Sequence, residues 1–309
     1  MTREKKYVIA IDVGGTFLKW TLVRLGQVED SVARDCFRSL PVDSGASAET
    51  VLATLAQVVE TALDMAGKQE LDVIGAGFSF PDPFDYERGI CWMEHKFQSI
   101  YGINLKEALA ERLDLPPDFS ILFEQDSSAF LLGEAGFGAA RGYDRVIGLT
   151  LGTGLGSAFM ADGKIIEQGP GIPSEGGGRL WCMPCAEGIT EDRISSRAIM
   201  AAYSRAAGEK NRCEDVKAIA GLASGGERVA GRVFEEFGSE LGNVLRPYVR
   251  QFEARCLVLG GQISRSFPLF SEQVKGRFQD IPHLKKVAQA ELIELAPLYG
   301  VASKFIQDE

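Results

Sequence analysis

Two turns rich in glycine follow apolar stretches at widely separated places in this chain. Each turn combines glycines with a threonine: Gly14, Gly15 and Thr16 in the first, and Gly152, Thr153 and Gly154 in the second. Because glycine has no Cβ, such turns leave backbone N–H groups open to phosphate oxygens. One turn alone would be weak evidence, since glycine turns are common in loops. Two turns of the same type suggest two related halves that hold one polyphosphate.

Acidic and basic residues stand close to the first turn and at a later strand end. Asp12 precedes the turn, where it could form the turn or point toward a hydrated Mg²⁺. Lys19 follows the turn and could face phosphate or be a solvated strand residue. Asp126 lies between an expected strand and an expected helix. It could cap the helix, or act as a general base that takes a proton from a hydroxyl nucleophile.

Four further residues could line a ligand site. Glu175 lies in a glycine-rich loop, and Glu191 lies near the start of an expected helix. Together they could bind a polyhydroxyl ligand, although each could also be an ordinary loop or helix-terminal charge. Gly260 and Gly261 follow an apolar stretch. They could admit a flat or anionic group, or form a tight turn before a helix.

A pair of cysteines has the spacing of a metal knuckle. Cys182 and Cys185 are separated by two residues, but a tetrahedral zinc site needs four ligands. The two histidines, His95 and His283, are distant in sequence. This pattern favours two free thiols over a zinc site, and a redox pair is a third, weaker interpretation.

Composition limits the classes of function. The chain has 309 residues, of which 45% are hydrophobic and 25% charged, as in soluble globular proteins. Its net charge of -10 argues against a nucleic-acid partner. No apolar run reaches the roughly 18 residues of a membrane span. The charged N-terminus lacks the apolar core of a signal peptide, so a cytoplasmic location is expected.

Strands and helices alternate along the chain, which predicts an α/β fold. Expected strands cover residues 7–11, 19–25, 28–37, 71–80, 119–124, 146–151, 157–161, 164–166, 255–259 and 291–295. Expected helices cover residues 46–67, 105–113, 127–136, 189–207, 215–223, 227–252 and 299–306.

Taken in order, five motifs resemble those of the ROK family of sugar kinases, within the actin-like ATPase clan. They are the first phosphate motif at residues 12–19, the catalytic segment at 125–134, the second phosphate motif at 151–156, the adenosine-side motif at 259–264 and the terminal helix motif at 296–302. Each motif is weak alone, but five in the same order cover nearly the whole chain.

The resemblance implies a two-lobed actin-like ATPase (ribonuclease H-like) fold with a cleft between the lobes. The expected lobes are residues 1–119 together with 297–309, and residues 120–296. It implies a sugar kinase that uses ATP and Mg²⁺, with Asp126 as general base and Asp12 orienting the hydrated metal. The two glycine turns would hold the phosphates, and Gly260 and Gly261 would lie on the adenosine side. A homodimer is also implied.

The resemblance further implies a set of sugar ligands, and here the sequence departs from the family pattern. The implied ligands are Ser79, Pro81, Lys96, Gln125, Glu175 and Glu191. Gly178 stands where the family usually has a histidine, and Gln125 and Lys96 stand where it usually has asparagines. The cysteine pattern of the family's zinc segment is also broken, so no zinc is expected. These changes favour a sugar other than glucose, or a charged derivative.

Three alternatives stay open. The chain could be a sugar sensor that keeps the fold without catalysis, or a sugar kinase that uses polyphosphate. It could also be an actin-like ATPase that acts on proteins, although Glu175 and Glu191 speak against that interpretation. Regulators of the family carry an N-terminal helix-turn-helix, and a first strand from Tyr7 leaves no room for one, which favours an enzyme.

Overall fold

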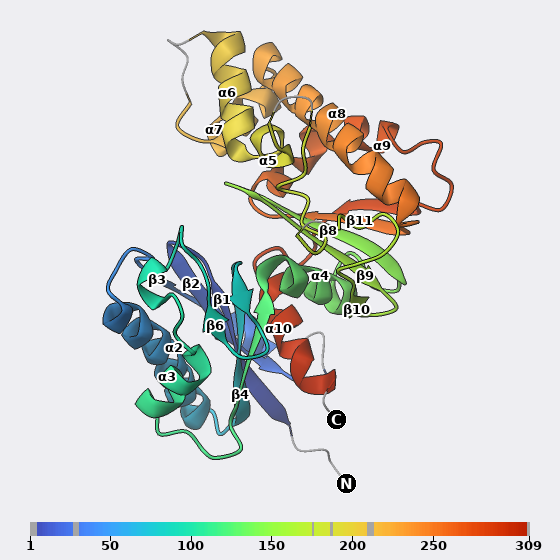
Figure 1. The fold of residues 1–309 in the computed structure, drawn as a ribbon. Coiled ribbons are helices and arrows are strands. Elements are labelled where there is room, and N and C mark those ends of the chain that lie inside the picture. Colours follow the sequence, from blue (N-terminus) through green and yellow to red (C-terminus); the bar gives the residue numbers. More distant parts are fainter. Residues whose placement is uncertain (1–4, 27–30, 175, 186–187, 209–212, 308–309) are drawn as a thin grey trace. The chain divides into compact units, whose positions relative to one another are not determined.

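The computed structural model describes residues 5–26, 31–174, 176–185, 188–208 and 213–307 (Figure 1). The chain divides into two compact units, each described here by itself. The first unit comprises Met1–Phe137 with Leu295–Glu309, and the second comprises Gly138–Glu294.

The first unit contains a five-stranded sheet in the order β3-β2-β1-β4-β7. Its strands are β1 (Lys6–Val13), β2 (Phe17–Arg24), β3 (Arg38–Pro41), β4 (Asp72–Phe80) and β7 (Ser120–Gln125). Strands β1, β2 and β3 pair antiparallel, whereas β1, β4 and β7 run parallel. The carboxyl ends of β1, β4 and β7 therefore meet at one edge of the sheet, which is where ligands of α/β sheets bind.

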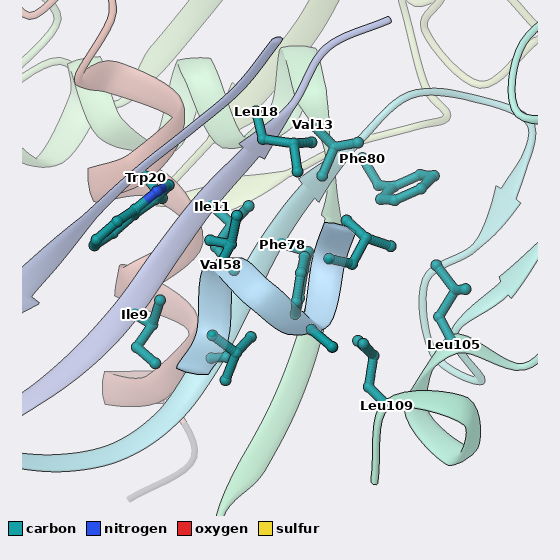
Figure 2. Packing of buried hydrophobic residues seen from close by; sticks show 14 of the residues in the cluster. Ile9, Ile11, Val13, Leu18, Trp20, Val58, Phe78, Phe80, Leu105 and Leu109 are labelled. Carbon is teal, nitrogen blue, oxygen red and sulfur yellow. The ribbon is translucent and has the colours of Figure 1, made fainter. Parts of the chain in front are cut away.

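Helices and a short hairpin complete the first unit. They are α1 (Ser31–Asp35), α2 (Ala48–Lys68), the hairpin β5 (Phe84–Asp85) and β6 (Ile90–Cys91), η1 (Gln98–Ile100), α3 (Leu105–Arg112), α4 (Asp126–Phe137) and α10 (Ala296–Gln307). Helix α2 places its apolar face on the sheet. Figure 2 shows Val58 of this helix beside Ile11 and Phe78 of the strands, and all three side chains are buried. This burial is the main stabilising contribution to the unit.

Helix α10 returns from the end of the chain to pack against α4 through glycines (Figure 1). A Cβ on Gly133 would lie 1.9 Å from the Ala296 carbonyl oxygen. A Cβ on Gly300 would lie 1.7 Å from the Ala129 carbonyl oxygen. The two helices therefore approach backbone to backbone. This contact fixes the helix that begins at Asp126.

The second unit contains a five-stranded sheet in the order β10-β9-β8-β11-β12. Its strands are β8 (Arg145–Leu151), β9 (Leu155–Ala161), β10 (Lys164–Ile165), β11 (Cys256–Gly260) and β12 (Lys286–Gln289). Strands β8, β9 and β10 pair antiparallel, and β8, β11 and β12 run parallel. Both units thus join an antiparallel hairpin to parallel strands, with a glycine turn in the hairpin.

Helices of the second unit lie against one another and the sheet. They are α5 (Thr190–Arg193), α6 (Ser196–Ala207), α7 (Val216–Ser224), α8 (Arg228–Gln251), η3 (Ile263–Leu269) and α9 (Ser271–Gly276). The long helix α8 buries one apolar face, which includes Val233, Phe237 and Leu241. No helix in the described ranges is long and apolar enough to cross a membrane.

Two expected strands and one expected helix differ from the structure. Instead of a strand at residues 28–37, the chain forms α1 and then β3, and residues 28–30 lie outside the described part. Instead of a strand at 291–295, the edge strand is β12, whose half-buried residues lack an apolar run. The helix expected at 189–207 is interrupted, because Ser195 caps α6 by accepting a hydrogen bond from the Ala198 amide.

The α/β class is confirmed, but the boundary between the units lies later than the sequence predicts. The sequence places it after residue 119, whereas the first unit extends to Phe137. Strand β7 pairs in register with β4, so β7 and the following α4 belong to the first sheet and its covering helices. The returning segment begins at Leu295 rather than at residue 297.

Candidate active site

The carboxyl edge of the first sheet gathers polar side chains from neighbouring strands. Asp12 of β1 stands opposite Ser79 of β4 in the parallel register. The Ser79 hydroxyl is buried and donates a hydrogen bond to Asp12 Oδ1 at 3.0 Å. Lys19 of β2 faces Asp12 across the hairpin. Asp12 is therefore held in place beside the first glycine turn.

Asp126 is the first residue of α4, and the neighbouring side chains leave part of its carboxylate open. Its Oδ1 accepts hydrogen bonds from the Ser127 amide at 2.6 Å and the Ser127 hydroxyl at 3.1 Å. Among the described residues, none donates a hydrogen bond to Oδ2. The helix is capped instead by Gln125, whose Oε1 accepts from the Ser128 amide at 3.1 Å. The capping role considered for Asp126 thus belongs to Gln125.

Gln125 uses its whole side-chain amide within this unit. Its Nε2 donates to Asp82 Oδ2 at 3.0 Å and to the Ser127 hydroxyl at 3.1 Å. Its Oε1 also accepts from the Ser128 hydroxyl at 2.9 Å. Two donated and two accepted bonds fill the hydrogen-bonding capacity of an amide. This arrangement leaves no spare position for the sugar hydroxyl that the sequence predicts Gln125 to bind.

Asp82 is a site residue that the sequence analysis missed. It follows β4 in the proline-containing loop, and its Oδ1 lies 2.8 Å from the Tyr86 hydroxyl. Its Oδ2 accepts the Gln125 bond. Its position two residues after a parallel strand, at the same edge as Asp12 and Asp126, is the signal that could have identified it. Pro81, a predicted sugar ligand, is buried directly before it.

The surroundings of Asp126 raise its pKa. Burial of the carboxyl group is the largest cause that raises the pKa of Asp126, followed by the negative charges of Asp82 and Asp12. Hydrogen bonds from Ser127 oppose this increase, and the resulting pKa is about 6. A carboxylate with this pKa is ionised at neutral pH and is more basic than an ordinary aspartate. Such a group suits general base catalysis.

The first glycine turn keeps hydrogen-bond donors available. The Gly14 amide closes the turn onto the Phe17 carbonyl at 3.0 Å. Within the described ranges, the amides of Gly15 and Thr16 and the Thr16 hydroxyl make no hydrogen bond. The side chain of Lys96 lies over Gly15, with its Cδ 3.6 Å from where a Cβ would stand. The turn can therefore bind an anion.

The second glycine turn, in the other unit, is braced by Glu191. The Leu155 amide donates to Glu191 Oε2 at 3.0 Å, and a Cβ on Gly154 would lie 2.5 Å from this oxygen. The other carboxylate oxygen pairs with Arg197 at 3.1 Å. The Gly152 carbonyl also accepts from the Ser196 amide at 2.8 Å. The predicted sugar ligand Glu191 thus supports the turn, while Thr153 at its tip is exposed.

Gly260 and Gly261 lie beside the strand that leads into the second turn. Gly260 pairs with Thr150 of β8, and Gly261 has a φ of 77°. A Cβ on Gly261 would lie 2.3 Å from the Leu151 carbonyl oxygen, so only glycine fits. The structure therefore groups the predicted adenosine-side glycines with the second turn.

The sequence predicts a sugar ligand, Glu175, and two free thiols, Cys182 and Cys185, in the loop before α5. Glu175 lies outside the described residues. The Cys182 thiol donates a weak hydrogen bond to the Arg179 carbonyl at 3.7 Å. No group of three or more histidine, cysteine, aspartate or glutamate residues that could hold a metal ion occurs in the described ranges.

Comparison with known proteins assigns the chain to a family. Residues 8–307 match the family model described as ROK. The chain belongs to the ROK family. It is 28% identical to a glucokinase from Thermotoga maritima, with 97% of each chain aligned. It is also 22% identical to the xylose repressor of Bacillus subtilis, over 97% of this chain and 77% of the repressor. The relatives of this chain thus include both a glucokinase and a repressor.

A solved ROK structure shares the fold. The glucokinase from Streptomyces griseus in complex with glucose and AMPPNP gives a TM-score of 0.72 at 24% identity. The alignment covers 96% of this chain and 98% of the glucokinase. This likeness confirms the predicted fold class, that of the actin-like ROK sugar kinases.

Proposed function

We propose that this ROK protein is an ATP-dependent sugar kinase, which transfers the γ-phosphate to a hydroxyl of a hexose or a hexose derivative. The observation that carries the proposal is Asp126, a carboxylate with a pKa of about 6 and an open oxygen at the ligand edge of a parallel sheet. Similarity to a glucokinase supports the same activity.

In this reaction Asp126 takes the proton of the sugar hydroxyl as the hydroxyl attacks the γ-phosphorus. The Ser127 hydroxyl donates to Asp126 Oδ1, so it fixes the carboxylate orientation and leaves Oδ2 for the substrate. Gln125 holds Ser127 and Asp82 in turn. Phosphoryl transfer depends mainly on positioning and electrostatic stabilisation, so a fixed base of this kind contributes directly to the rate.

The nucleotide is assigned to the glycine turns and to Asp12. Gly14 closes the first turn, and the Gly15 and Thr16 amides with the Thr16 hydroxyl offer donors to phosphate oxygens. Gly152, Thr153 and Gly154 form the matching turn in the second unit. The Asp12 carboxylate is the kind of oxygen ligand that Mg²⁺ prefers, and Ser79 holds it next to the turn. Mg²⁺, when bound, neutralises phosphate charge. Lys19 faces Asp12, and Gly260 and Gly261 are assigned to adenosine.

A second candidate function follows from the similarity to the xylose repressor. The chain would then bind a sugar without transferring phosphate. Use of polyphosphate as donor also stays a prediction, as do the sugar contacts of Glu175, Glu191, Pro81 and Ser79. The cytoplasmic location and the homodimer also stay predictions.

An ADP-release assay over hexoses, amino sugars and N-acetylated sugars tests the proposal. We expect one group of sugars to stimulate ADP release in the presence of Mg²⁺. Asp126→Asn should lower kcat by about 10²- to 10⁴-fold, the usual contribution of a general base. Asp118→Asn, an exposed aspartate of the same unit, is the matched control. Sugar binding by calorimetry, with no ADP release from ATP and no sugar phosphate formed from polyphosphate, would instead identify a sensor.

A further inference from the structure

The loop that carries Lys96 is fastened onto the segment beside the first glycine turn. The Phe97 amide donates to the Ser44 carbonyl at 2.9 Å, and the Phe97 ring is fully buried. With its neighbour anchored in this way, Lys96 extends over Gly15. Its Cδ and Cε lie 3.6 and 3.8 Å from where a Gly15 Cβ would stand. The lysine stem thus packs on the part of the turn where a side chain is absent.

The ammonium of Lys96 has no partner in the described part of the chain. Lys96 is exposed and forms no ion pair or hydrogen bond there. Its Nζ is one bond beyond Cε, so it is within reach of an anion that sits on the turn. The amides of Gly15 and Thr16 are open at the same place. Two open amides and an unpaired ammonium together form an anion site that a glycine turn alone would not provide.

The charge of the surroundings explains why such a lysine is needed. Asp12, Asp82 and Asp126 lie at this edge of the sheet, and the charges of Asp82 and Asp12 add to the effect of burial in raising the pKa of Asp126. An incoming phosphoryl group is itself negative and would be repelled by three carboxylates. Lys19 stands opposite Asp12 in the register of the hairpin. Lys96 is placed to offset the charge of the anion on the turn.

We propose that Lys96 is a catalytic residue whose ammonium binds the phosphoryl group held by the first glycine turn. This inference rests on the proposed kinase function. In the loose transition state of phosphoryl transfer, negative charge is spread over the equatorial oxygens, and a fixed ammonium stabilises it. The P–O bond to ADP breaks and the bond to the sugar oxygen forms, while Lys96 keeps its proton throughout. The ammonium of Lys96 could also bind an anionic group on the sugar, and the binding experiment below distinguishes this anion from the phosphoryl group.

The test compares Lys96→Gln with Lys96→Arg and the control Lys68→Gln. Lys68 is an exposed lysine in the last turn of α2, before the amino end of β4 and therefore at the opposite edge of the sheet. With a neutral sugar, Lys96→Gln should lower kcat by about 10- to 100-fold and leave the sugar KM within about twofold. Lys96→Arg should recover part of the rate. Lys68→Gln should match the wild type.

A binding experiment separates the two sources of the anion. Calorimetry with Mg²⁺ should show that Lys96→Gln weakens AMPPNP binding more than ADP binding. Unchanged kcat and unchanged AMPPNP affinity in Lys96→Gln would overturn the proposal. A loss restricted to sugars that carry phosphate or carboxylate would also overturn it, and would assign Lys96 to the acceptor. If the wild type phosphorylates no sugar, the proposed function fails, and the AMPPNP comparison still decides the role of Lys96.

Discussion

Gln125 Nε2 donates a hydrogen bond to Asp82 Oδ2 at 3.0 Å, and this bond joins the end of β7 to the loop that follows β4. The same nitrogen also donates to Ser127, which in turn donates to Asp126. One amide therefore sets the positions of two carboxylates. A residue that acts through its neighbours in this way should affect the rate more than the binding of sugar.

Gln125→Glu tests this positioning role. The new carboxylate would replace an amide that donates to Asp82 and would add negative charge beside Asp126, so the pKa of Asp126 should rise further. We expect kcat at pH 7 to fall by about 10- to 100-fold, with a smaller change in the sugar KM. The acid limb of the pH profile should move to higher pH. Gln57→Glu, an exposed glutamine of α2, is the control. A raised sugar KM with unchanged kcat would instead show a direct sugar contact.

The pH dependence of the wild type follows from the pKa of Asp126. A general base must be ionised, and burial together with Asp82 and Asp12 raises this pKa to about 6. We therefore expect kcat/KM to fall with decreasing pH below about 6 and to level off above it. Steady-state rates between pH 5 and 8 measure this. A profile that stays flat down to pH 5 would be inconsistent with Asp126 as the base.

The same pKa predicts that Asp126→Asn stabilises the protein. A raised pKa means that the folded protein binds the proton more tightly than the unfolded chain. The contribution of Asp126 to stability is therefore full below about pH 4 and is lost as the pH rises through about 6. Asparagine stays neutral. The free energy of unfolding of the variant should therefore exceed that of the wild type by roughly 1–3 kcal/mol at pH 7 and by little at pH 4. Urea unfolding at the two pH values measures the difference, and equal gains at both would contradict it.

Gly300→Ala tests the packing of α10 on α4. Its Cβ would lie 1.7 Å from the Ala129 carbonyl oxygen, so the helices would have to separate. We expect the free energy of unfolding to fall by about 3 kcal/mol or more, as for other substitutions that overpack a core severely. Gly136→Ala is the control, because a Cβ there meets nothing within 4 Å and alanine favours helix. Similar stability for both variants in urea unfolding would refute the close backbone contact.

The sequence predicts the elements that repeat a local pattern, and misses what depends on tertiary contacts. Both glycine turns and Asp126 could be located because a strand, a turn and a helix start are local features. The position of Asp82 after a parallel strand could have marked it as a candidate, but its bond to Gln125, 43 positions away, is a tertiary contact without a local signal. The sugar contact of Glu191 stays a prediction, and its bond to the Leu155 amide, which the sequence does not predict, comes from the fold of the second unit.

Phosphorus NMR of the reaction with ATP, Mg²⁺ and the best sugar of the panel shows whether the protein transfers the γ-phosphate to a sugar and whether Asp126 is needed for the transfer. We expect the γ-phosphate signal to be replaced by the signal of a sugar phosphate monoester, and we expect this conversion nearly to stop with Asp126→Asn although the variant stays folded. Release of inorganic phosphate in place of a sugar phosphate, or a normal rate of conversion by Asp126→Asn, would contradict it.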